Sequence, residues 1–167
     1  MRYTLKERIF SLRDSYYIQD ENGENGFEVQ GKLITLHNTL ILRNLKTDEE
    51  SKIWEKRLSL RSTYVIERPN QPDVSVRKDL INILREGFTI DMPGNVPDLR
   101  IQGDILDKNY TITRDGETVA QASKKWISLR DSYAIDVAAS EDPVLIIACA
   151  IIIDRLAHED EAKERDS

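Results

Sequence analysis

A nine-residue unit that recurs six times constrains the fold of this chain more than any other feature of its sequence. FSLRDSYYI, which starts at residue 10, returns almost unchanged as ISLRDSYAI at residue 127. Four looser copies lie between them: ITLHNTLIL at 34, LSLRSTYVI at 58, NILREGFTI at 82 and DILDKNYTI at 104. Successive copies start 24, 24, 24, 22 and 23 residues apart. Spacing this even is typical of a repeated structural unit.

The columns of the repeat predict a β-hairpin. The seventh and ninth positions are apolar or aromatic, and residues two apart lie on the same face of a strand. The ninth position holds Ile18, Leu42, Ile66, Ile90, Ile112 and Ile135. Positions four to six carry polar turn formers, as in Arg13-Asp14-Ser15. Each unit is therefore interpreted as the middle of a hairpin whose seventh and ninth side chains face the core.

Six hairpins give twelve strands joined by short links, which indicates an antiparallel meander. Further turn formers separate the units, as in DENGENG at 20–26 and DMPGNVPD at 91–98. A sheet of this size closes into a barrel because closure removes its unpaired edges. We expect a mainly β protein with a closed twelve-stranded antiparallel barrel over about residues 1–139.

The C-terminal segment supplies a filler for this barrel. Residues 143–153, PVLIIACAIII, are apolar throughout and follow the helix-capping sequence SED. The run is shorter than the roughly 20 residues that a membrane-spanning helix needs. A helix that is apolar on all sides must be buried on all sides, and a twelve-stranded barrel has a lumen to bury it. We expect a central buried helix at about 141–157 in a single domain of residues 1–157, followed by a charged, flexible tail at 158–167.

The recurring SLRDSY, the DENGENGFEVQGK connector, the stretch GDILDKNYTITRDGETVAQASKKW and the apolar C-terminal helix resemble the LURP-one-related family. The resemblance covers roughly residues 1–157. That family belongs with the Tubby C-terminal-like superfamily, which includes the phospholipid scramblases, and its fold is a twelve-stranded barrel around a central C-terminal helix. Relatives in the superfamily bind phosphoinositide headgroups or are credited with moving phospholipids. The resemblance therefore implies contact with lipid headgroups as one function.

Composition narrows the classes of partner and the compartment. The net charge is −6, which disfavours a nucleic-acid partner. The N-terminus, MRYTLKERIF, has charges where a signal peptide has an apolar run, so we expect a cytoplasmic protein, either free or peripheral to a membrane. Cys149 lies in the apolar stretch IIACAII, which predicts a buried, reduced thiol rather than a nucleophile.

The hairpin arrangement predicts barrel ends of opposite charge. The fourth position of the unit places basic side chains at one rim: Arg13, His37, Arg61, Arg85 and Arg130. The other rim collects Asp20, Glu21, Glu24, Asp48, Glu49, Glu50, Asp73, Asp91 and Asp98. Arg13, Arg61, Arg85 and Arg130 are therefore candidates for binding an anionic headgroup. The more common reading is that each arginine is a solvated turn residue in a weak local ion pair.

Other patterns point to structure rather than chemistry. Lys52 and Lys56 flank Trp54, and Lys124 and Lys125 precede Trp126; such strands can bind single-stranded nucleic acid, but lysine outward and tryptophan inward is the more common arrangement. Asp104 and Asp107 sit around a predicted turn. No catalytic, metal or cofactor site can be assembled from the sequence. We expect a non-enzymatic binding or scaffold protein without cofactors, with an anionic lipid or phosphoinositide-binding, scramblase-like module as the alternative.

Overall fold

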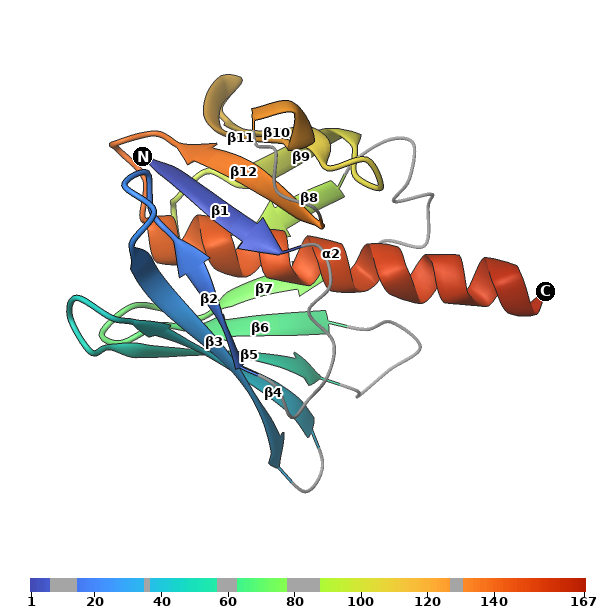
Figure 1. The fold of residues 1–167 in the computed structure, drawn as a ribbon, viewed down its shortest axis with the longest axis horizontal. Coiled ribbons are helices and arrows are strands. Elements are labelled where there is room, and N and C mark those ends of the chain that lie inside the picture. Colours follow the sequence, from blue (N-terminus) through green and yellow to red (C-terminus); the bar gives the residue numbers. More distant parts are fainter. Residues whose placement is uncertain (7–14, 35–36, 57–62, 78–87, 127–130) are drawn as a thin grey trace.

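The structure is a computed structural model that describes residues 1–6, 15–34, 37–56, 63–77, 88–126 and 131–167. Figure 1 shows a barrel of strands with one long helix running through it. The strands are β1 (Arg2–Lys6), β2 (Ser15–Gln19), β3 (Asn25–Ile34), β4 (His37–Asn44), β5 (Glu50–Lys56), β6 (Thr63–Glu67), β7 (Val74–Arg77), β8 (Phe88–Asp91), β9 (Leu99–Asp104), β10 (Asn109–Arg114), β11 (Glu117–Ser123) and β12 (Ser132–Val137). A short 3-10 helix, η1 (Lys124–Trp126), follows β11, and the long helix is α2 (Pro143–Asp166).

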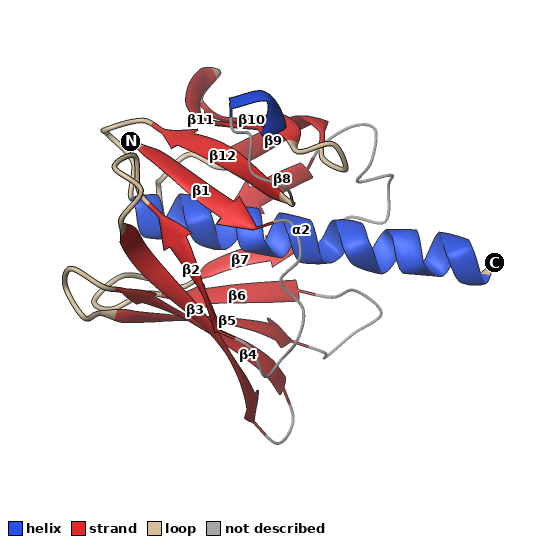
Figure 2. Ribbon diagram, viewed as in Figure 1, coloured by secondary structure: helices blue, strands red, loops and turns tan. Residues whose placement is uncertain are grey.

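The barrel confirms the prediction from the repeat. All strands are antiparallel, each pairs with its neighbours in sequence, and β1 closes the barrel by pairing with β12. The six units correspond to the hairpins β1/β2, β3/β4, β5/β6, β7/β8, β9/β10 and β11/β12. This mainly β architecture appears clearly in Figure 2, where one helix runs within a wall of strands. In such a barrel, turns within hairpins share one end and turns between hairpins share the other.

The repeat columns build the core as expected. The ninth-position side chains are at most 1% exposed in all six copies. At the seventh position, Leu40, Tyr64, Tyr110 and Tyr133 are buried, and Tyr16 packs against the same core. Of the third-position leucines, the structure describes only Leu106, which is partly buried against the core. Period-two alternation therefore decides which side chains face the interior.

Helix α2 lies inside the barrel. Its side chains at positions 145–153 are at most 2% exposed and belong to the same hydrophobic cluster as the inward-facing strand residues. The Asp142 side chain caps the helix by accepting a hydrogen bond from the Val144 backbone N–H at 2.9 Å. The helix begins close to the expected position but continues to Asp166 rather than ending near 157. Figure 1 shows its last turns extending beyond the strands, so the charged segment continues the helix instead of leaving it.

The two sides of β1 are held very differently. On one side it shares five residue pairs with β12, from Arg2↔Asp136 to Lys6↔Ser132. The Arg2 guanidinium adds two hydrogen bonds to the Asp136 carboxylate, at 2.6 and 2.8 Å. On the other side, the one pair between β1 and β2 among the described residues is Thr4↔Gln19. The described parts of β1 and β2 thus pair less than those of β1 and β12, and we call the contact between β1 and β2 the seam.

Candidate functional site

The centre of the barrel is occupied by the side chains of α2. Because these side chains pack against the inward-facing strand residues, the interior around residues 145–153 is a filled core as far as the structure describes it. Cys149 is part of this core. Burial raises the pKa of its thiol to about 12, so the thiolate needed for nucleophilic chemistry is suppressed at neutral pH. The prediction of a buried thiol is confirmed.

A polar cluster interrupts this core where α2 approaches the end of the barrel formed by the turns within hairpins. Asp154 on α2 is fully buried, and the Tyr133 hydroxyl donates a hydrogen bond to its Oδ2 at 2.8 Å. Lys108 Nζ lies 2.9 Å from Asp154 Oδ1, and the lysine side chain is only 4% exposed. Lys108 reaches inward from the turn between β9 and β10, where its φ is 52°. The cluster therefore ties α2 to two hairpins through one carboxylate.

Two further tyrosines join the cluster without completing their hydrogen bonds. The buried Tyr16 hydroxyl makes no hydrogen bond to the described residues, and the buried Tyr110 hydroxyl lies against that of Tyr133 without a well-aligned hydrogen bond. Tyr16, Tyr110 and Tyr133 all occupy the seventh position of the repeat. Their shared column explains why they meet at one level around the helix, since equivalent positions of successive hairpins lie side by side in the barrel.

Burial dominates the electrostatics of the cluster. It raises the pKa of Asp154 above its usual range, although the Lys108 ammonium and the Tyr133 hydroxyl oppose that shift. It also raises the pKa values of Tyr16, Tyr110 and Tyr133 well above the ordinary tyrosine value, and the Asp154 charge adds to each of these shifts. The phenols thus stay neutral, and the ammonium of Lys108 is the group that compensates the carboxylate.

The opposite end of α2 is anchored by two arginines. Arg68 pairs with the capping residue Asp142 at 2.7 Å. Arg114 donates two hydrogen bonds to the Glu141 carboxylate, at 2.9 and 3.2 Å, and a third to the Pro97 carbonyl at 2.7 Å. Glu141 and Arg114 are only 10% and 17% exposed, so this pair is shielded from solvent. These contacts fix where the helix enters the barrel.

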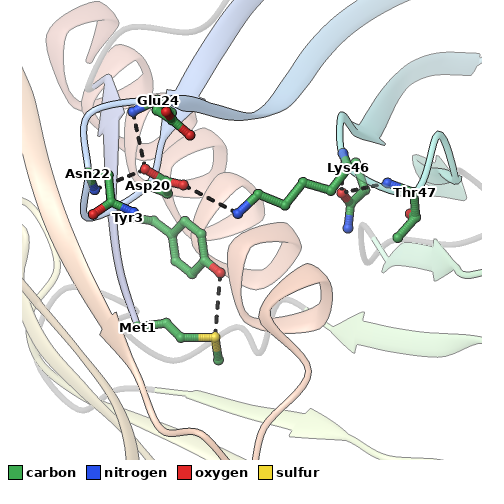
Figure 3. Close-up of polar contacts among 8 residues, drawn as sticks. Met1, Tyr3, Asp20, Asn22, Glu24, Lys46 and Thr47 are labelled. Carbon is green, nitrogen blue, oxygen red and sulfur yellow. Dashed lines mark hydrogen bonds and ion pairs between the residues drawn. The ribbon is translucent and has the colours of Figure 1, made fainter.

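The acidic residues predicted for this end are partly neutralised by local partners. Figure 3 shows the Asp20 carboxylate accepting hydrogen bonds from the backbone N–H groups of Asn22 and Glu24, at 2.9 and 3.1 Å. The same carboxylate forms an ion pair with Lys46, at 3.4 Å. Desolvation opposes the shift, but these donors together lower the Asp20 pKa. Asp48 pairs with Arg43 and Asp91 with Arg77. Three residues of the predicted acidic rim, Asp20, Asp48 and Asp91, are therefore paired with basic side chains.

The predicted headgroup residues Arg13, Arg61, Arg85 and Arg130 lie outside the described residues. The backbone of His37 begins β4, but its side chain is likewise outside the description. The basic rim therefore stays a prediction.

The prediction that tryptophan alternates inward with outward lysines is wrong. On β5, Trp54 shares the outer face with the exposed Lys52 and Lys56, while Ile53 and Glu55 face inward. The parity of the three positions requires this, because side chains two residues apart lie on the same face. The Trp54 Nε1–H is satisfied by the Glu67 carboxylate at 2.8 Å on the neighbouring strand. The equivalent stretch at Lys124–Trp126 forms η1 rather than a strand.

Asp104 has the structural role that its place near a turn predicted. Its carboxylate accepts a hydrogen bond from the Asp107 backbone N–H at 3.0 Å, which stabilises the turn between β9 and β10. This turn also carries Ile105, which is fully buried, and Lys108. Gly103 immediately before it has a φ of +126°, and a Cβ there would lie 2.6 Å from the Asn109 carbonyl oxygen. The backbone at Gly103 thus lies in close contact with the start of β10.

A groove of about 390 Å³ lies at the seam between β1 and β2. Its lining residues are Thr4, Lys6, Ser15, Tyr16, Tyr17, Gln19, Asn25 and Ser132. A second groove, of about 550 Å³, lies among Pro97, Asp98, Arg100, Gln102, Asp115 and Gly116. The second groove borders β9 and β10, which share six residue pairs, whereas the first lies between strands that share one. Of these two grooves, the seam groove is the one between strands that share a single pair among the described residues.

Neither the seam groove nor the Lys108–Asp154–Tyr133 cluster was identified from the sequence. Two features of the sequence could have indicated the cluster: Asp154 interrupts the apolar run of α2, and tyrosine recurs at the seventh position of the repeat. Lys108 gave no such signal, because its inward direction depends on the turn. The seam depends on how far two strands diverge, which no residue pattern in either strand specifies.

Comparison with known proteins shows which family the chain belongs to. The chain is 29% identical over 158 residues to the protein named "Uncharacterized protein YxjI" of Bacillus subtilis (strain 168), which covers 94% of each chain. No solved structure matches the present chain. No helix among the described residues is long and apolar enough to cross a membrane. The family model described as LURP-one-related matches residues 1–154, which include all twelve strands and most of the buried part of α2. The chain belongs to the LURP-one-related family.

Proposed function

We propose that this protein is a non-enzymatic binding module that engages its partner on the outer surface of the barrel. The observation that supports this most directly is the complete burial of the α2 side chains at positions 145–153 within the barrel core. A substrate cannot share that space without displacing the helix. Binding must then use the wall or the rims, which is how a scaffold rather than a typical enzyme pocket works.

The chemistry of the buried groups supports the same proposal. The Cys149 thiol has a pKa of about 12 and is enclosed by core side chains. The Asp154 carboxylate is engaged by Lys108 and Tyr133 rather than presented to solvent. Both groups are therefore committed to the core and are poorly placed to attack or protonate a substrate.

Native mass spectrometry of the protein purified from its own cells tests this function. We expect a fraction of the protein to retain a polypeptide or other companion, whose mass stays constant during incubation at the growth temperature. Time-dependent conversion of a retained small molecule would show that the protein is an enzyme. A protein that carries no companion, even after mild chemical cross-linking before lysis, would count against a binding role.

A retained phospholipid would instead favour the alternative of an anionic headgroup site at the basic rim. Sedimentation with vesicles of phosphatidylserine, against vesicles of phosphatidylcholine, examines this alternative directly. The matched protein is a variant with Arg13, Arg61 and Arg130 changed to Ala. Selective sedimentation of the native protein, lost in the variant, would assign lipid binding to this rim; equal and negligible sedimentation of both would remove it.

A further inference from the structure

The second groove, of about 550 Å³, lies on the outside of the barrel wall at the end where the turns between hairpins gather. All of its lining residues fall within 88–126, a stretch that the structure describes without a gap. β9 and β10 run side by side beneath it (Figure 1) and share six residue pairs. Leu99 and Ile101 are buried in the core, so Arg100 and Gln102 stand on the outer face. The floor of the groove is thus a well-paired part of the sheet.

Hydrogen bonds hold the walls of the groove in place. The Asp98 carboxylate accepts one from the Met92 backbone N–H at 2.8 Å, and Arg114 donates one to the Pro97 carbonyl at 2.7 Å. On the other side, Asp115 has a φ of 51° within the tight turn that joins β10 to β11. A site whose walls are fixed in advance loses little freedom when a ligand binds.

The charges at the groove lack partners. Asp98 and Asp115 lie just beyond the last residue pair of β9 and β10, so two carboxylates share one end of the groove. Arg100, two residues from Asp98, lies on the same face of the strand. None of these three side chains forms an ion pair with a described residue. Like charges at facing positions of a sheet repel each other, and a cation between them would remove that repulsion.

We propose that the second groove binds a zwitterion of dipeptide length, with its ammonium group between Asp98 and Asp115 and its carboxylate on Arg100. This inference rests on the proposed binding function and names a ligand class and a site for it. Positions two residues apart on a strand are separated by about 7 Å, which is also about the span of two extended residues. A single amino acid spans only about half of that distance. A guanidinium group can hold a carboxylate through two parallel hydrogen bonds.

Other occupants fit the groove less well. The described residues contain no group of three His, Cys, Asp or Glu side chains able to hold a metal ion, so the two aspartates favour an organic cation. An anionic headgroup would meet these carboxylates as well as Arg100. A purely cationic ligand such as a diamine would leave Arg100 unpaired. The volume of about 550 Å³ falls within the range of small-molecule sites.

Amide NMR titration of the full chain with glycine dipeptides tests this assignment. Gly-Gly carries both charges, N-acetyl-Gly-Gly only the carboxylate and Gly-Gly-amide only the ammonium. We expect Gly-Gly to shift the amides of Arg100, Gln102 and Gly116 and to bind at least about threefold more tightly than either capped form, the contribution of one exposed ion pair. Free glycine should bind more weakly than Gly-Gly, because it cannot span both charges. Equal affinities for all of these probes would contradict the proposal.

Removal of single charges assigns each end of the ligand to its partner. Arg100→Gln should abolish the advantage of Gly-Gly over Gly-Gly-amide, because the carboxylate then has no guanidinium to bind. Asp115→Asn should reduce the advantage of Gly-Gly over N-acetyl-Gly-Gly. The matched changes Lys52→Gln and Asp73→Asn, at exposed positions outside the groove, should alter neither ratio. An unchanged ratio in either groove variant, with native amide dispersion retained, would overturn the site.

The pattern of shifts separates failure of this inference from failure of the binding function. Shifts with Gly-Gly that cluster at Lys6 and Tyr17 in the seam groove would overturn the site but leave an outer-wall binding module intact. An absence of shifts, in a protein that native mass spectrometry shows carrying a companion, would overturn only the zwitterion assignment. An absence of shifts in a protein that also carries no companion would overturn both.

Discussion

Lys108 Nζ lies 2.9 Å from Asp154 Oδ1, so a turn residue between two strands forms a buried ion pair with the helix inside the barrel. Both side chains are at most 4% exposed. An ion pair of this kind is costly to desolvate, and its main consequence is that neither partner can be removed alone without leaving the other uncompensated.

Changing Lys108 to Met should destabilise the protein by about 3 kcal/mol at neutral pH, because the Asp154 charge is left buried without its partner. Urea unfolding measures this change. The double variant Lys108→Met with Asp154→Leu should recover most of the loss, since it removes both charges. An exposed matched change, Lys56→Met, should have little effect. A Lys108→Met variant as stable as the native chain would show that the pair is not formed in solution.

The loss in Lys108→Met should grow with pH. Burial already raises the pKa of Asp154 above 3.8, and removing the ammonium raises it further. Folding of the variant then takes up a proton, so its stability is greatest below the unfolded-state pKa of the carboxyl and falls as the pH rises toward the folded-state value. Urea midpoints at about pH 5 and about pH 8 should therefore differ more for the variant than for the native chain. A pH-independent difference would contradict this assignment of the titrating group.

Two tyrosines of the same repeat column should respond differently to loss of their hydroxyls. Tyr133→Phe removes a donor to Asp154 and should cost about 1–3 kcal/mol, because a buried carboxylate oxygen is left unsatisfied. Tyr110→Phe removes a buried hydroxyl that lies against Tyr133 without a well-aligned hydrogen bond, and should be nearly neutral. Thermal unfolding of the two variants in one buffer makes the comparison, and equal losses would contradict it.

Gly103 should tolerate alanine far less than Gly23. At Gly103 a Cβ would lie 2.6 Å from the Asn109 carbonyl oxygen and 2.8 Å from Tyr110 Cα, and the φ is +126°. At Gly23 the φ is +78°, but no atom lies within 4 Å of the added Cβ. Gly23→Ala therefore carries backbone strain of about 1 kcal/mol, whereas Gly103→Ala adds steric overlap and should cost several times as much. Equal unfolding midpoints for the two variants would show that the turn is looser than the structure indicates.

The barrel can be predicted from the sequence because the hairpin pattern is local and recurs along the chain. The inward positions of Ile18, Ile66 and Ile135 follow from period-two alternation, and the even spacing of the units predicts the order of the strands. The charged residues after 157 predict a tail, whereas α2 continues to Asp166, because charge alone does not end a helix. The buried cluster and the seam cannot be predicted in the same way. The inward direction of Lys108 and the divergence of β1 and β2 depend on the path of the backbone between elements rather than on a residue pattern.

The central claim is that α2 stays within the barrel in the native state, so that partners bind outside it. Native-state hydrogen exchange of the α2 amides at residues 146–153 tests this directly, with the free energy of opening compared with the free energy of global unfolding in urea. If the helix is a permanent core element, the two free energies agree and these amides exchange only through global unfolding. Opening free energies several kcal/mol below the global value, shared across this part of the helix, would show that α2 leaves the barrel and that the interior is available to a ligand.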